Sequence, residues 1–168
     1  NDWFDVETDK ISHPERPLVT GETSPKVALL FALFLVILAI ASGFMISPLH
    51  GYAVLIPIAL LWAYACFFKG VPLVGNVLVA LLVAYTLLFG ALGYEAGELI
   101  IPAILAALGN FLREIIKDIA DADGDAAAGI TTTATLPRSL LQGIIIACWF
   151  IYIGLGIVPY MVNYFGEM

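Results

Sequence analysis

The sequence predicts an all-α membrane protein, a polytopic bundle of transmembrane helices. Hydrophobic residues make up 61% of the 168 residues and charged residues only 12%, whereas a soluble domain carries about 25% charged residues. The mean hydropathy is +0.98. Four long stretches contain no charged residue: 27–46, 51–68, 70–94 and 139–166. Because a helix needs about 20 apolar residues to cross a bilayer, these stretches are long enough to form transmembrane helices.

Five transmembrane helices fit the chain in order. A further apolar run, 99–112, continues into the amphipathic segment Arg113–Lys117 and supplies the fourth helix. We therefore expect transmembrane helices at 27–46, 51–68, 72–93, 99–118 and 139–162. Pro57 and Pro159 fall inside two of them, where proline bends a helix.

We expect one domain, in a fragment of a longer protein that is truncated at both ends, since the chain begins with Asn1 inside a motif. The predicted parts are a first acidic motif with its loop (1–26), four transmembrane helices (27–118), a second acidic motif with its loop (118–138) and a fifth helix (139–162).

Acidic residues concentrate in two stretches, Asn1–Asp9 and Asp118–Asp125, so the net charge of −7 is largely local. Four predicted helices separate the stretches, and an even number of crossings returns the chain to the same side of the membrane. All seven basic residues also fall on that side. Because positive charge is retained on the cytoplasmic side, we expect a multi-pass protein of the cell membrane whose acidic stretches face the cytoplasm.

Helical spacing gathers the carboxylates of each stretch on one face. At about 100° per residue, Asn1, Asp5 and Asp9 span about 80°, with Asp2 beside them. If the second stretch is one continuous helix, four of its carboxylates fall within about 60°: Glu114, Asp118, Asp121 and Asp125. Such like charges repel unless a cation compensates them, and Mg²⁺ bridges carboxylates to phosphates. The expected metal ligands are Asn1, Asp2, Asp5, Asp9, Asp118, Asp121 and Asp125. A solvated acidic surface is the alternative interpretation for either stretch alone.

Basic residues on the same side complete a predicted diphosphate site. Guanidinium and ammonium groups neutralise phosphate oxygens, and arginine does so in bidentate fashion. The expected diphosphate-binding residues are Asn1, Lys10, Arg16, Tyr64, Lys69, Arg113 and Lys117. Simple anchoring at the membrane interface is the alternative role for Lys69, as it is for Lys26.

These motifs resemble those of the UbiA superfamily of intramembrane prenyltransferases. The first motif is Asn1-Asp2-x-x-Asp5-x-x-x-Asp9 with a later Arg16-Pro17-Leu18, and the second is Asp121-x-x-x-Asp125 within Arg113-Glu114-x-x-Lys117-Asp118-Ile119. Between them, Tyr64 to Lys69 and Gly75-Asn76 look like the family's tyrosine–lysine element and the Gly-Asn that follows it. The resemblance implies nine helices in the complete protein. It also implies a Mg²⁺-dependent reaction with these catalytic residues: Asp5, Asp9, Arg16, Lys117, Asp121 and Asp125.

Within the superfamily, the motifs look most like those of the archaeal digeranylgeranylglyceryl phosphate synthases. The implied function is transfer of a polyprenyl group, geranylgeranyl in those enzymes, from its diphosphate to the hydroxyl of geranylgeranylglyceryl phosphate in ether-lipid biosynthesis. One segment departs from the pattern, because Ile130-Thr131-Thr132-Thr133 lacks the basic residue expected before threonine. An aromatic acceptor of the quinone, haem or chlorophyll type is therefore the alternative.

Other classes of function fit the sequence less well. A transporter would place ionisable groups near the midplane, but the predicted helices are nearly free of charge. The net charge of −7 argues against a nucleic-acid partner, whose binding needs basic residues. The expected partners are therefore a polyprenyl diphosphate donor and a lipid-like acceptor in the membrane, and we predict no protein partner.

Overall fold

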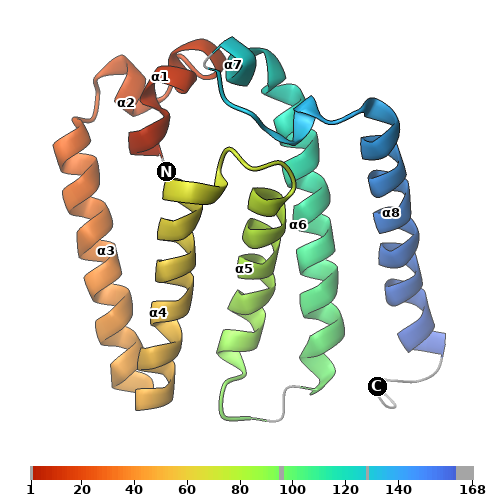
Figure 1. Cartoon of the computed structure of the whole chain (residues 1–168). Helices are drawn as coiled ribbons and strands as arrows, with labels where there is room; N and C mark the ends of the chain where they lie inside the picture. The colour runs from red at the N-terminus through yellow and green to blue at the C-terminus, as the bar shows by residue number, and fades with distance from the viewer. Residues whose placement is uncertain (1, 95–96, 128, 162–168) are drawn as a thin grey trace.

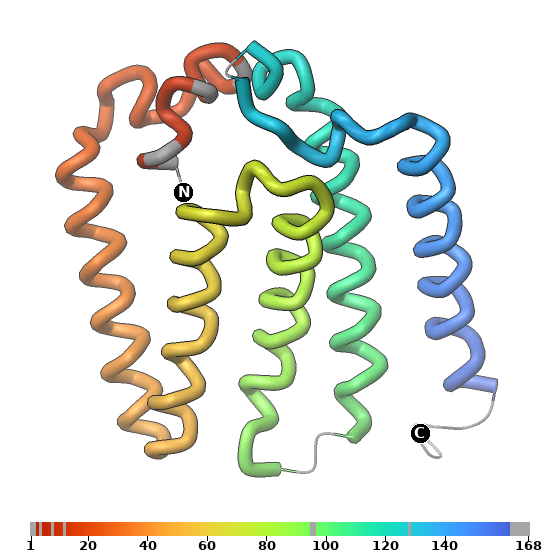
Figure 2. Tube along the Cα trace, viewed as in Figure 1, coloured from red at the N-terminus to blue at the C-terminus, as the bar shows by residue number. Residues whose placement is uncertain are grey.

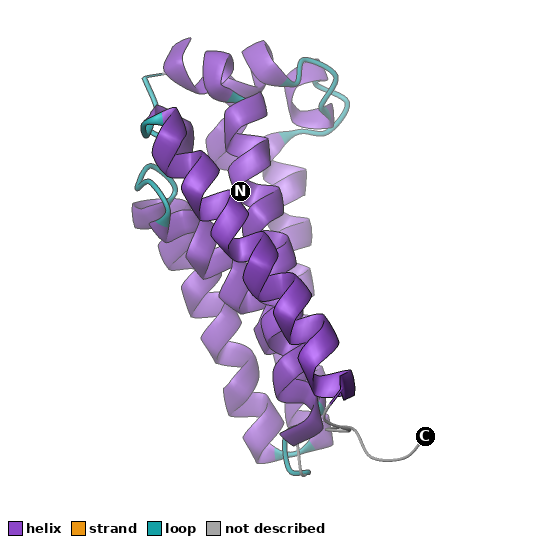
Figure 3. Cartoon of the chain, turned by 90° about the vertical axis from the view of Figure 1, so that its right-hand side faces the viewer, coloured by secondary structure: helices purple, strands orange, loops and turns teal. Residues whose placement is uncertain are grey.

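Five long helices run side by side in the computed structural model, which describes residues 2–94, 97–127 and 129–161 (Figure 1). They are α3 (Pro25–Ile46), α4 (Pro48–Ala63) with its π-helical end η1 (Tyr64–Phe68), α5 (Val74–Gly90), α6 (Ile100–Ala120) and α8 (Arg138–Met161). Three short helices, α1 (Asp2–Ser12), α2 (Pro17–Thr20) and α7 (Ala122–Ala127), gather at one end, which we call the acidic end. A side view shows the same arrangement (Figure 3). The described residues contain no strand, so the all-α prediction is confirmed.

Four of the five long helices can span a membrane by length and composition, and the protein is a multi-pass membrane protein. These are Pro25–Ile46, Pro48–Phe68, Gly97–Ala120 and Arg138–Met161. The fifth, Val74–Gly90, has 17 residues, at the short end of the range of about 17–25 that crosses a bilayer. The predicted span 72–93 was therefore too long. Its first residues form a turn in which Leu73 has a φ of 63°, and Gly93 turns the chain beyond its end with a φ of 89°.

Short polar residues and prolines set where the membrane helices begin. The Ser24 hydroxyl caps α3 by accepting the Val27 N–H, and Pro25 follows at the first helical position. The same pattern starts α4, where Ser47 accepts the His50 N–H. Such caps satisfy backbone donors that have no partner within the helix. Pro57 and Pro159 both lie inside helices, as predicted.

Glycine allows α3 and α4 to pack closely. A Cβ at Gly51 would overlap the ring of Phe44, and a Cβ at Gly43 would lie 2.9 Å from the Val54 Cγ2. Much of the remaining surface of α3 is apolar and exposed, with Leu30 and Ile37 each 66% exposed. A helix that is hydrophobic all round is expected in a membrane.

α6 differs from α3 because it carries buried polar residues. It lies between α5 and α8 (Figure 2). Ile115 is fully buried, and Glu114 beside it is only 9% exposed. α6 runs into the acidic end, so it connects the buried part of the bundle to the second acidic stretch.

Candidate functional site

The two acidic stretches meet at the acidic end, although α3 to α6 separate them in the chain. α1 contacts α7 directly, and Figure 2 shows the two segments together above the long helices. The even number of membrane crossings therefore brings both stretches to the same side, as predicted.

The carboxylates of α1 are buried against basic residues. Asp5 and Asp9 are each 5% exposed. Arg16 donates through Nη1 to Asp9 Oδ2 at 2.7 Å, and the Lys69 ammonium pairs with Asp5 Oδ1. A buried carboxylate is costly without a compensating charge. The Lys69 pair therefore holds α1 against the end of η1, and the Arg16 pair ties α1 to the segment that follows it. Lys69 and Arg16 therefore both lie beside the buried carboxylates of the first acidic stretch.

Two other predicted cations lie differently. Lys10 pairs with Glu7 at 2.6 Å, and both side chains are mostly exposed. Arg113 pairs with Glu114, and its side chain is 68% exposed. Both residues therefore pair with an acidic neighbour close in sequence.

The second acidic stretch is not the continuous helix that we predicted. α6 ends at Ala120, Asp121 follows in a non-helical conformation with φ −89° and ψ 2°, and α7 begins at Ala122. The break lies within the stretch, so the single stripe from Glu114 to Asp125 does not form. Glu114 and Asp118 stay on α6, whereas Asp125 is carried by α7.

Asp121 joins the two stretches at this break. Its carboxylate lies 3.6 Å from the Lys117 Nζ and 3.5 Å from the His13 Nε2. His13 follows α1 and lies in the His-Pro-Glu-Arg-Pro segment, where two prolines fix the loop. Sequence reasoning missed this residue as part of the site, and the stiff loop was the only signal for it.

The acidic end carries an excess of negative charge around α7. Burial raises the pKa of Asp125 above its ordinary value of 3.8, and the charges of Asp118 and Asp121 raise it further, while Lys117 and Lys69 oppose the shift. A carboxylate whose neighbours already disfavour ionisation is stabilised by an added cation.

A hydrogen-bond network links Asp118 to two segments distant in sequence. The Asn76 Nδ2 donates to Asp118 Oδ2 at 2.9 Å, and the Thr133 hydroxyl donates to Asn76 Oδ1. The same hydroxyl accepts the Leu73 N–H at 2.9 Å. Thr133 is 1% exposed and Asn76 6%. The network therefore fixes which way the Asn76 amide faces and holds its N–H toward the Asp118 carboxylate.

Sequence reasoning did not assign Asn76 or Thr133 to the site. Their signals were the Gly75-Asn76 pair and the threonine run 131–133, where a basic residue was expected. In this chain the segment contributes a buried hydroxyl to the network.

Two cavities adjoin these polar groups. A small one, about 20 Å³ in volume, is lined by Tyr64, Lys69, Asn76, Glu114, Asp118 and Thr133, among others. A larger one of about 350 Å³ shares Tyr64 and Glu114 with it, and is completed by Lys117 and the apolar Leu61, Ala65 and Val79. The predicted residue Tyr64 therefore lies where the charged acidic end meets an apolar space between helices.

The described members of the predicted ligand set lie at the acidic end without forming a closed metal site. Among the described residues, no group of three or more His, Cys, Asp or Glu side chains is arranged to hold a metal ion. The reason is that Asp5, Asp9, Asp118 and Asp121 each contact a basic or amide side chain. The donor set still suits a hard divalent cation, because it consists of carboxylates from both stretches at one end of the bundle. Asn1 and the side chain of Asp2 lie outside the described part.

Comparison with known proteins agrees with this arrangement. The model of the UbiA prenyltransferase family matches residues 1–168. Among curated relatives named digeranylgeranylglyceryl phosphate synthase, the Methanopyrus kandleri protein is 37% identical over 86% of this chain and 52% of its own length. The Natronomonas pharaonis protein is 34% identical over 99% of this chain and 61% of its own. The Pyrococcus abyssi protein is 43% identical over 79% of this chain and 48% of its own.

The chain thus spans about half the length of the curated relatives it matches. No solved structure matches it significantly. The family model covers the paired acidic stretches, the lysine after η1 and the helices that bring them together. The chain therefore belongs to the UbiA prenyltransferase family.

Proposed function

We propose that the protein of which this chain forms part transfers a geranylgeranyl group from its diphosphate to the free hydroxyl of geranylgeranylglyceryl phosphate, forming the second ether bond of an archaeal lipid. The observation that carries the proposal is the meeting of α1 and α7, which gathers carboxylates and cations from both acidic stretches at one end of an apolar bundle. The names of the curated relatives support the choice of acceptor.

The proposed reaction exchanges one carbon–oxygen bond for another. The bond between the allylic carbon and the diphosphate breaks, and its electron pair leaves with the diphosphate. The acceptor oxygen then bonds to that carbon, and its proton passes to a carboxylate of the site or to the released diphosphate. Stabilising the leaving group's developing negative charge in a water-poor site is the largest effect available to such an enzyme.

Residues of this chain supply much of that stabilisation. Arg16, Lys69 and Lys117 present cationic groups at the acidic end, where they would bind and orient the diphosphate. Lys10 and Arg113 would need to leave their Glu7 and Glu114 partners to join them. Tyr64, which lines both cavities, would lie beside the diphosphate.

Mg²⁺ fits the carboxylate set and, when bound, would neutralise the charge of the diphosphate. The proposed ligands come from both stretches: Asn1, Asp2, Asp5, Asp9, Asp118, Asp121 and Asp125. The chain holds these carboxylates in place before substrate arrives by pairing four of them with basic or amide groups.

The start of the prenyl chain would lie in the cavity of about 350 Å³. This cavity lies between the charged end and the membrane helices, with Leu61, Ala65 and Val79 in its wall. An apolar wall excludes water from a reactive allylic cation. We also propose that the acidic end faces the cytoplasm, since every basic residue of the chain was predicted on that side.

The test uses membranes that carry the full-length protein, Mg²⁺ and labelled geranylgeranyl diphosphate. Geranylgeranylglyceryl phosphate and an aromatic acid are offered together as acceptors. Label in a doubly prenylated glycerol phosphate is the expected result. Label on the aromatic acid alone would keep the metal and donor site but overturn the acceptor.

Variants test the site itself. Asp5→Asn and Asp121→Asn should each abolish Mg²⁺-dependent turnover while the protein still inserts into the membrane. Glu22→Gln removes an exposed carboxylate on the same side and serves as the matched control. Turnover near the wild-type rate in either aspartate variant would refute the site assignment.

A further inference from the structure

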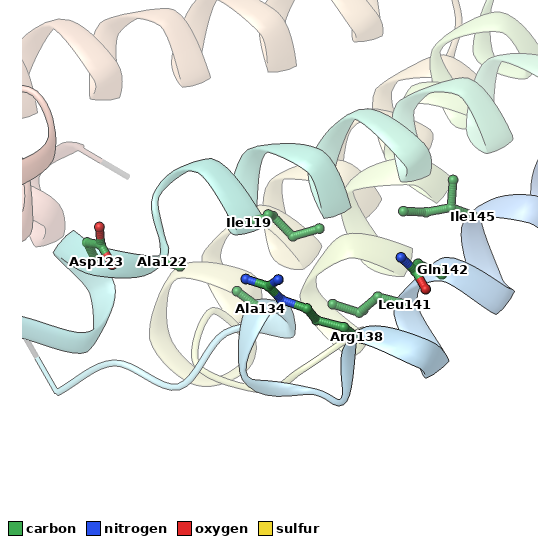
Figure 4. A pocket seen from close by; sticks show the side chains of 8 residues that line it. All are labelled: Ile119, Ala122, Asp123, Ala134, Arg138, Leu141, Gln142 and Ile145. Atoms are coloured by element: carbon green, nitrogen blue, oxygen red, sulfur yellow. The ribbon is translucent and has the colours of Figure 1, made fainter.

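A second large cavity lies on the other side of α6 from the candidate site. It has a volume of about 360 Å³ and opens between α6–α7 and the start of α8 (Figure 4). Its wall combines apolar and charged residues, among them Ile119, Asp123, Ala134, Arg138, Leu141 and Ile145. The proposed reaction uses none of these residues.

The geometry of α6 separates this cavity from the diphosphate site. Lys117 lines the cavity that faces α4 and α5, whereas Ile119 lines the cavity that faces α8. Residues two positions apart on a helix point about 160° away from each other. A molecule in the α8 cavity therefore lies across α6 from the groups that would bind the donor.

The basic residue of this cavity is Arg138, the first residue of α8. Its side chain is exposed, and among the described residues its guanidinium has no carboxylate partner within ion-pair distance. In Figure 4 the guanidinium lies over Ala134 and toward α6, with Asp123 at one end of the cavity and Ile145 at the other. A cation beside an apolar wall, at the end of two membrane helices, matches an amphiphile with an anionic head.

We propose that this cavity binds a membrane phospholipid. Arg138 pairs with the phosphate, Gln142 beside it offers an amide donor, and the start of the lipid chain lies on Ile119, Leu141 and Ile145. Asp123 disfavours a head that carries further negative charge at its end of the cavity. It favours a phosphodiester that bears an ammonium or a hydroxyl group, such as an ethanolamine headgroup.

The experiment uses the full-length protein in nanodiscs of phosphatidylcholine that contain a trace of photoactivatable phosphatidylethanolamine. After irradiation, labelled peptides are mapped by mass spectrometry. The wild type should be labelled within residues 119–145. Since an exposed ion pair contributes up to about 1 kcal/mol, Arg138→Gln should reduce this labelling up to about five-fold. Arg138→Lys should retain most of it.

Two further variants make the test decisive. Lys26→Gln removes another exposed cation near a helix start and should leave the labelling unchanged. Ile145→Trp fills the apolar end of the cavity and should block labelling while Arg138 is still present, which guards against misfolding of the arginine variant. Circular dichroism of each variant reports whether it folds.

The lipid is distinguished from the reaction's acceptor by competition. Geranylgeranylglyceryl phosphate should not displace the photoactivatable lipid, and prenyl transfer by Arg138→Gln should match the wild-type rate. Displacement by the acceptor, or labelling that falls equally in Arg138→Gln and Lys26→Gln, would overturn the proposal. So would an absence of label within 119–145. These results leave the prenyl-transfer test untouched, because that test reads a different product.

Discussion

Replacing Thr133 by valine removes the hydroxyl at the centre of the network that holds Asp118. That hydroxyl accepts the Leu73 N–H at 2.9 Å and donates to the Asn76 Oδ1. Valine matches threonine in shape but has no polar atom, so the change removes two hydrogen bonds and leaves the volume almost unchanged. We expect Thr133→Val to destabilise the protein and to loosen Asp118.

The magnitude follows from the burial of the two partners. A buried group that loses its hydrogen-bond partner costs about 1–3 kcal/mol. Thr133 is 1% exposed and Asn76 6%, so water has little access to replace the hydroxyl. Two such groups give a loss of about 2–6 kcal/mol in the free energy of unfolding. Relaxation of the Leu73 loop reduces this, because a non-glycine residue with a φ of 63° is strained by about 1–3 kcal/mol. We therefore expect about 1–3 kcal/mol.

The assay is unfolding of the full-length protein in mixed micelles with increasing sodium dodecyl sulfate, followed by circular dichroism. Thr133→Ser keeps the hydroxyl and should lose much less stability. Thr131→Val changes an exposed threonine nearby and is the matched control. The Thr133→Val enzyme should also need more donor for half-maximal rate. If Thr133→Val and Thr131→Val unfold alike, the network does not stabilise the protein as argued.

Three further predictions concern charge and packing. Lys69→Gln should cost about 3 kcal/mol of stability, because it removes the cation beside buried Asp5, and adding Asp5→Asn should restore most of it in the same unfolding assay. In buffer with a metal chelator, Asp125 should contribute a loss of stability as the pH rises from 3.8 through its raised pKa, because the folded state holds that proton more tightly than the unfolded chain. Asp125→Asn should lack this loss. Gly51→Ala should cost about 1–3 kcal/mol, since its Cβ would overlap the ring of Phe44.

Controls and refuting results differ for each. If Lys69→Gln and the double variant are equally stable, the charges of Lys69 and Asp5 do not stabilise each other. If the wild type instead gains stability relative to Asp125→Asn over the same window, the Asp125 shift has the wrong sign, and adding Mg²⁺ should flatten the loss. Gly90→Ala is the control for packing, because a Cβ at Gly90 would meet nothing within 4 Å. If it destabilises as much as Gly51→Ala, close helix approach is not the cause.

Several features of the fold were decided by the order of residues alone. Charge-free runs of about 20 residues define membrane helices wherever they occur, so four of the five predicted spans agree closely with Pro25–Ile46, Pro48–Phe68, Gly97–Ala120 and Arg138–Met161. The number of crossings then requires both acidic stretches to lie at one end. The spacing of acidic and basic residues within those stretches also pointed to the family that the whole chain matches.

Other features depended on how the helices pack. Sequence spacing suggested a continuous acidic stripe from Glu114 to Asp125, but the helix ends at Ala120 and Asp121 turns toward His13. α5 is short because the chain turns at Leu73, which has a φ of 63°. A positive φ usually belongs to glycine, so the residue type at this position does not predict the turn.

The arrangement of the candidate site depends on contacts between distant segments. Asn76 and Asp118 are 42 positions apart, and Thr133 and Asn76 are 57 apart, so no local pattern links them. Lys69, which follows α3 and α4 in the chain, pairs with Asp5. Lys10 is close to Asp5 and Asp9 in sequence but pairs with Glu7. The hydropathy of each segment and the number of membrane crossings follow from the order of residues alone. They determine which segments cross the membrane and on which side they emerge. The partner of each buried charge depends on which side chains the packed helices bring within a few ångströms, and only the tertiary structure decides that.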